Sequence, residues 1–104
     1  MLKQIEQFLI NLRDDINKID SELSLKNTIQ KYDMLLLGDK FNTINSIEFI
    51  HSLNYVSGID VTNDELVKML PELAHDLNFT YDYLIVYNDK NKDNPDIKGF
   101  FIYL

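Results

Sequence analysis

Apolar residues at the start of the chain recur at a helical spacing. They lie alternately three and four positions apart over three heptads, as at the a and d positions of a coiled coil. These residues are Leu2, Ile5, Leu9, Leu12, Ile16, Ile19 and Leu23. The pattern fits two alternatives: an amphipathic helix that covers its own domain, or a seam through which two copies form a homodimer.

The apolar stripe does not continue into the next helical segment. On one straight helix, the following apolar residues would lie on the opposite side. These are Leu25, Ile29, Tyr32 and Leu36. A break at residues 21–24 removes the conflict, because serine is a preferred N-cap residue and Ser21 and Ser24 stand there. The sequence therefore predicts two helices, at about 2–21 and 25–37, with Gly38 as the stop signal.

Two further helices are predicted from their N-terminal capping sequences. Asn45 and Glu48 have the spacing of a capping box, and so do Thr62 and Glu65. The residues expected to face the core are Ile44, Ile47, Ile50 and Leu53 on the third helix and Leu66, Met69 or Leu70, Leu73 and Leu77 on the fourth. Gly58 lies just beyond the predicted end of the third helix.

Two features interrupt the helical pattern between residues 59 and 78: a proline and a short β-prone segment. Pro71 lies inside the fourth helical pattern, where proline costs about 3 kcal/mol. We therefore expect either a kink at 70–71 or two short helices, at 63–70 and 71–78. Residues 59–61, Ile-Asp-Val, predict a short strand.

The C-terminal quarter predicts a long β-hairpin. Residues 81–87 and 98–104 are rich in aromatic and β-branched side chains, and the polar stretch 88–96 joins them. With 104 residues and no linker-like segment, we expect one α+β domain. Its N-terminal part, residues 2–37, is a helical hairpin or a long broken helix.

The net charge of −7 is unevenly distributed. Between Gly58 and Asp89 the only cation is Lys68, against seven acidic residues. Such a surface repels nucleic-acid backbones, whose binding depends on Lys and Arg, and favours a protein partner. The predicted acidic interaction face consists of Asp60, Asp64, Glu65, Glu72, Asp76 and Asp82. The alternative is that the charge only keeps the protein soluble.

No catalytic, cofactor or metal site is predicted. The chain has no cysteine, no glycine-rich phosphate loop and only two histidines, His51 and His75. Residues 89–93 carry the Asp-x-Asn-x-Asp pattern of a calcium-binding loop, but Asn94 and Phe100 stand where its glycine and its bidentate Glu belong. The absence of cysteine fits a reducing cytoplasm, where we expect the protein. The N-terminus lacks signal-peptide features, and no segment approaches the roughly 20 apolar residues of a membrane span.

The predicted order of elements from residue 43 onward resembles the winged-helix family. It runs helix, short strand, two helices, strand, loop and strand, with 89–97 as the wing and 71–78 as the recognition helix. The resemblance covers residues 43–104, rests on this order alone, and implies a DNA-binding role with the recognition helix in the major groove. Residues 71–78 contain Glu72 and Asp76 but no Lys or Arg, which a DNA reader needs.

Three functional hypotheses follow. The first is a non-enzymatic acidic protein-interaction module, and its narrower form is an inhibitor or regulator that mimics nucleic acid, as small acidic proteins of phages and mobile elements do. The second is a dimeric winged-helix regulator of transcription or replication that binds DNA. The third is a subunit of an enzyme whose chemistry lies on a partner. The charge distribution favours the first.

Overall fold

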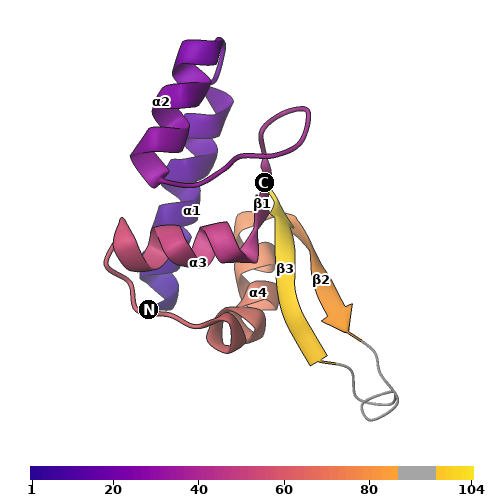
Figure 1. Ribbon diagram of the computed structural model, residues 1–104. Helices are drawn as coiled ribbons and strands as arrows, with labels where there is room; N and C mark the ends of the chain where they lie inside the picture. Colours follow the sequence, from indigo (N-terminus) through magenta and orange to yellow (C-terminus); the bar gives the residue numbers. More distant parts are fainter. Residues whose placement is uncertain (87–95) are drawn as a thin grey trace.

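The computed structural model describes residues 1–86 and 96–104 (Figure 1). In these ranges it has four helices and a three-stranded antiparallel sheet. The elements are α1 (Leu2–Asn17), α2 (Glu22–Tyr32), β1 (Thr43–Asn45), α3 (Ser46–Tyr55), α4 (Asn63–Leu77), β2 (Thr80–Val86) and β3 (Asp96–Tyr103). The prediction of an α+β protein with N-terminal helices and C-terminal strands is confirmed. The predicted wing and the Asp-x-Asn-x-Asp pattern lie almost wholly outside the described residues.

The apolar stripe of α1 is buried in the chain's own core. The buried residues of α1 are Ile5, Phe8, Leu9, Leu12 and Ile16. Leu2 and Ile19 pack against this core, whereas Leu23 is 67% exposed and belongs to α2. The face proposed as a dimer seam is thus covered within one chain, as the intramolecular alternative expects. A homodimer through residues 2–23 would have to form without these side chains.

The helical break lies at residues 18–21, before the predicted 21–24, and α2 begins at Glu22 rather than at residue 25. Both helices are shorter than expected. Ser21 caps α2, and its hydroxyl oxygen accepts a hydrogen bond from the backbone N–H of Ser24 at 3.1 Å. The predicted end of α2 near Gly38 is wrong. The helix stops at Tyr32 because Asp33 takes a left-handed conformation, with φ 47°. The chain then continues without helix to Leu37, which pairs with Thr43.

The start of α3 changes which residues of this segment face the core. Asn45 caps the helix as predicted and accepts from Glu48 N–H at 3.0 Å. Ile44 is buried, but it lies on β1 rather than on a helix. The inward prediction for Ile47 is wrong, because its side chain is 78% exposed while Phe49 is fully buried. A helix that begins at Ser46 turns residues 49 and 53 inward together.

Residues 59–61 do not form the predicted strand. After α3, Gly58 adopts a positive φ of 68°, and Ile59 N–H donates back to the Leu53 carbonyl at 2.8 Å. Val61 N–H donates to the side-chain oxygen of Asn54 at 3.2 Å. The segment is therefore tied to the end of α3 and leads directly into α4.

α4 is one helix from Asn63 to Leu77, with Pro71 inside it. The predicted division into two helices is therefore wrong, whereas the capping box of Thr62 and Glu65 is confirmed. Of the residues expected to face the core, Leu66, Leu70 and Leu73 are fully buried, and Met69 and Leu77 are partly buried.

The sheet has the strand order β1-β3-β2, so the C-terminal strand is central. β2 and β3 form the predicted hairpin, with Tyr83 opposite Phe100. One sheet face packs on the helices through Ile44, Phe100 and Ile102, all fully buried. Phe49 joins α3 to this face, because its ring lies edge-on to that of Phe100 with centroids 6.3 Å apart.

Candidate functional site

The exposed side of α4 is the main acidic surface of the helical part. Four of the predicted acidic residues lie there: Asp64, Glu65, Glu72 and Asp76. At 100° per residue they fall within an arc of about 120°. Lys68 and His75 are exposed on the same side of the helix. The arrangement concentrates negative charge opposite the buried leucines of α4.

Glu6 of α1 joins this surface, and sequence reasoning missed it. The pKa of Glu6 is raised above its ordinary value, first by a side-chain hydrogen bond with Asp76. Loss of hydration and repulsion by the carboxylates of Asp76 and Glu72 act in the same direction. Only the packing of α1 against α4 brings Glu6 to two acids that lie more than 60 residues later in the chain.

The other predicted acidic residues have different surroundings. Asp60 is exposed in the connection between α3 and α4. The Glu65 carboxylate is engaged in the helix cap, where it accepts from Thr62 N–H and Oγ1–H, each at 3.1 Å. These two residues therefore lie at or before the first turn of α4, away from Glu72 and Asp76.

Asp82 does not belong to the same surface. The hydroxyl of Tyr83 donates to a carbonyl of α4, so Tyr83 points toward that helix. Successive side chains of a strand point to opposite faces, which places Asp82 on the other face of the sheet. There its carboxylate accepts a 2.9 Å hydrogen bond from Tyr103 Oη. The acidic surface is hereafter defined as Glu6, Glu72 and Asp76, because Asp64 lies with Glu65 in the first turn of α4.

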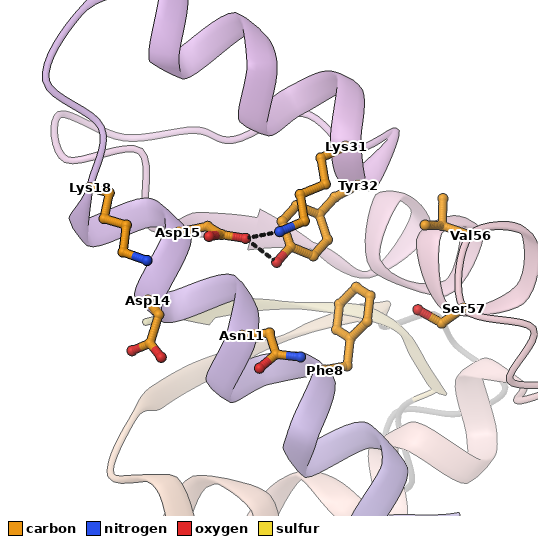
Figure 2. Close-up of a pocket in the computed structure, with 9 residues that line it drawn as sticks. All are labelled: Phe8, Asn11, Asp14, Asp15, Lys18, Lys31, Tyr32, Val56 and Ser57. Atoms are coloured by element: carbon orange, nitrogen blue, oxygen red, sulfur yellow. Dashed lines mark hydrogen bonds and ion pairs between the residues drawn. The ribbon is translucent and has the colours of Figure 1, made fainter.

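A pocket of about 360 Å³ lies between α1, the end of α2 and the end of α3 (Figure 2). It is lined by Phe8, Asn11, Asp14, Asp15, Lys18, Lys31, Tyr32, Val56 and Ser57. Within it, Asp15 Oδ2 accepts hydrogen bonds from Lys31 Nζ at 2.7 Å and from Tyr32 Oη at 2.5 Å. These bonds join α1 to the last turn of α2.

The protonation states of Asp15 and Tyr32 suit a hydrogen-bonded anchor between α1 and α2. Hydrogen bonds from Lys31 and then from Tyr32 lower the pKa of Asp15, so it is ionised at neutral pH. Burial, and then the hydrogen bond to Asp15, raise the pKa of Tyr32 well above its usual 10, so its hydroxyl stays protonated.

The two histidines lie apart. Nε2 of His51 on α3 pairs with Asp33 Oδ2 at 2.7 Å, and its ring packs on Tyr55 with centroids 5.0 Å apart. His75 lies in the last turn of α4, where a basic group suits the helix C-terminus. Across residues 1–86 and 96–104, no three His, Asp or Glu side chains are grouped so as to hold a metal ion.

No family model, curated protein or solved structure matches this chain. Among the helices in the described ranges, none is long and apolar enough to cross a membrane. The fold and the surfaces above are therefore the basis for a functional proposal.

Proposed function

We propose that this protein is a non-enzymatic interaction module whose acidic surface binds a basic site on a protein partner. The observation that carries the proposal is the meeting of Glu6 from α1 with Glu72 and Asp76 from α4. Carboxylates held together at a helix–helix boundary create a local negative potential that speeds encounter with a basic partner and selects for it. We further propose a cytoplasmic location, which suits a cysteine-free chain.

The test compares two triple variants of equal net charge. Glu6→Gln/Glu72→Gln/Asp76→Asn removes three charges from the acidic surface. Asp20→Asn/Glu22→Gln/Asp39→Asn removes three exposed acids elsewhere and serves as the control. Affinity capture from lysate with mass spectrometry should recover a partner with the wild type and the control but not with the surface variant. A partner retained equally by both variants would contradict the proposal.

The pH dependence of binding provides a second readout. Because neighbouring carboxylates raise the pKa of Glu6, a cationic partner should stabilise its ionised form and lower that pKa again. Affinity for the captured partner should therefore increase as pH rises through the Glu6 pKa toward neutrality. The variant Glu6→Gln should reduce this dependence, which isothermal titration at several pH values measures.

A narrower form of the proposal is nucleic-acid mimicry, in which the carboxylates occupy a basic cleft that otherwise binds phosphates. A partner of this kind should itself bind DNA or RNA, and the nucleic acid should compete with this protein for it. If added nucleic acid does not reduce binding of this protein to the partner, mimicry is rejected, while the broader interaction proposal still stands.

The second candidate function is a winged-helix DNA regulator. The order predicted from residue 43 does not hold, because residues 59–61 form no strand and α4 is one helix. The observed order α1, β1, α3, α4, β2, β3, with α2 added after α1, gives the same succession of helix, strand, two helices and two strands, which supports this candidate. All of α4 would then be the recognition helix, and β1 would replace the expected strand at 59–61. The acids on the exposed side of α4 oppose phosphate binding. Retardation of mixed-sequence DNA at low salt, with a steep salt dependence, would favour this candidate over the acidic module.

A further inference from the structure

The two edges of the sheet differ in how they are protected. β1 spans three residues, and its outer side is paired with Leu37 through Thr43. β2 spans seven residues, Thr80–Val86, and no described strand pairs with its outer side (Figure 1). Proteins usually protect such edges with Lys, Pro or a covering segment. β2 contains neither Lys nor Pro.

The hydrogen bonds of β3 show which main-chain groups of β2 face outward. Phe100 N–H donates to Ser46 Oγ and Leu104 N–H donates to the Asn42 carbonyl, both on the β1 side. Because backbone directions alternate along a strand, Phe101 and Tyr103 turn toward β2. Their partners Asp82 and Thr80 therefore turn inward to β3. The N–H and C=O groups of the intervening residues, Tyr81 and Tyr83, point away from the sheet.

The side chains beside this edge suit association. Leu84 is 45% exposed and Ile85 is 40% exposed, on opposite faces of the strand. Asp82 is the only charged residue of β2, and Tyr103 holds its carboxylate. A seven-residue strand of high β-propensity with one charge is a strong candidate for pairing with another strand.

We propose that β2 pairs antiparallel with β2 of a second copy of this chain, which joins two sheets into one of six strands. Tyr83 is the central residue of β2, so full overlap places it opposite Tyr83 of the partner. This register also places Asp82 opposite Leu84 of the second copy. A shift that paired Tyr81 with Tyr83 would instead place the two Asp82 carboxylates opposite each other, which is unfavourable.

The chemistry of the edge favours a second copy as the occupant. In this register the outward main-chain groups of Tyr83 meet those of Tyr83 in the second copy, and those of Tyr81 meet those of Ile85, so the strand complements itself. The exposed side chains of Leu84 and Ile85 gain cover. Pairing through β2 does not require the apolar face of α1 to leave the core of its own chain. A seven-residue pairing is smaller than a standard protein interface, so we expect a reversible dimer with a Kd on the order of micromolar to hundreds of micromolar.

Sedimentation velocity with hydrogen exchange tests the dimer. The wild type should change from 12.3 kDa to twice that mass as its concentration rises to about 1 mM. In parallel, the amides of Tyr81 and Tyr83 should become protected. Leu84→Lys/Ile85→Lys should remain a folded monomer, whereas the control Leu23→Lys, which changes a residue 67% exposed on α2, should still dimerise.

Cross-linking tests the register. Each single-cysteine variant carries one thiol, because the chain has no cysteine. Residues 82 and 84 of opposing chains form a non-hydrogen-bonded pair with Cα atoms about 4.5 Å apart, within disulfide range. A mixture of Asp82→Cys and Leu84→Cys should therefore give the mixed disulfide, while Asp82→Cys alone should not cross-link to itself.

Three results would overturn the proposal. The first is a monomer throughout the concentration range, with exchange of the Tyr81 and Tyr83 amides independent of concentration. The second is a dimer that Leu23→Lys dissociates and Leu84→Lys/Ile85→Lys leaves intact. The third is efficient self-cross-linking of Asp82→Cys, which would show a different register.

Discussion

The hydroxyl of Tyr83 on β2 donates a 3.5 Å hydrogen bond to the carbonyl of Val67 on α4. In an uninterrupted helix this carbonyl would accept from the N–H of residue 71, but Pro71 has no N–H. The strand thus supplies a donor to a helical carbonyl that proline leaves without one. This contact explains in part how α4 continues past a residue that normally ends or kinks a helix.

The first prediction is a coupling between Pro71 and Tyr83. Pro71→Ala should raise the free energy of unfolding by roughly 1–2 kcal/mol, because alanine restores the N–H and removes the ring clash. Tyr83→Phe should lower it by about 0.5–1 kcal/mol in the wild type, because the Val67 carbonyl loses its donor. Urea denaturation of the two single variants and the double variant gives the coupling energy.

In the Pro71→Ala background, Tyr83→Phe should cost clearly less, because the Val67 carbonyl then has a helical donor. An equal cost of Tyr83→Phe in both backgrounds would show that the hydroxyl does not serve this carbonyl.

The second prediction concerns the pH dependence created by Asp15 and Tyr32. The lowered pKa of Asp15 stabilises the fold above its unfolded pKa of about 3.9, and this contribution is lost as pH falls through the folded value. Asp15→Asn should therefore cost about 1 kcal/mol at pH 7, and this difference should vanish in strong acid. Unfolding midpoints across the acid range measure it.

Tyr32 acts at the alkaline end with the opposite sign. Its pKa is raised on folding, so the stabilisation is complete below about pH 10 and decreases as pH rises beyond that value. Tyr32→Phe should flatten this alkaline decrease. An alkaline profile identical to that of the wild type would mean that Tyr32 does not control it.

The third prediction follows from the close approach of Gly99 to Ser46. A Cβ on residue 99 would lie 2.6 Å from Ser46 Oγ, the buried acceptor of the Phe100 N–H. Gly99→Ala should therefore destabilise the protein by roughly 1–3 kcal/mol. Ser46→Ala should cost about 1–3 kcal/mol, because it leaves the Phe100 N–H without a partner.

The double variant Ser46→Ala/Gly99→Ala distinguishes steric conflict from independent effects. Without the Ser46 hydroxyl, the new methyl group has room, so the double variant should lose less than the sum of the single losses. Thermal or urea unfolding of all three proteins measures this, and strict additivity would show that the two residues do not compete for space.

The fourth prediction compares two residues of the N-terminal heptad pattern. Leu12 is fully buried, whereas Leu23 is 67% exposed. Leu12→Asp should unfold the protein, because a buried unpaired carboxylate costs more than the margin of a small domain. Leu23→Asp should change stability by no more than about 0.5 kcal/mol. Circular dichroism distinguishes the outcomes, and a folded monomeric Leu12→Asp variant would support the dimer seam instead.

The sequence was most informative where local chemistry decides. Caps at Ser21, Asn45 and Thr62 mark helix starts because their side-chain oxygens satisfy N–H groups within three residues. The hairpin of β2 and β3 follows from β-prone residues on both sides of a polar stretch. The burial of Ile5, Leu9, Leu12 and Ile16 follows from helical periodicity, although that pattern did not decide between core and dimer.

The roles of several residues depend on contacts with segments distant in the chain, and only the tertiary structure shows them. Ile44 becomes a strand residue because Ile102 pairs with it, and no local pattern shows this. Asp82 leaves the acidic surface because alternation along β2 turns it to the other face of the sheet, and Glu6 joins because α1 packs on α4. Local sequence was enough for the class of the fold, the starts of α1, α3 and α4, and the excess of acid. Packing between distant segments decided which acids share a surface, because charge acts through distance in space and not along the chain.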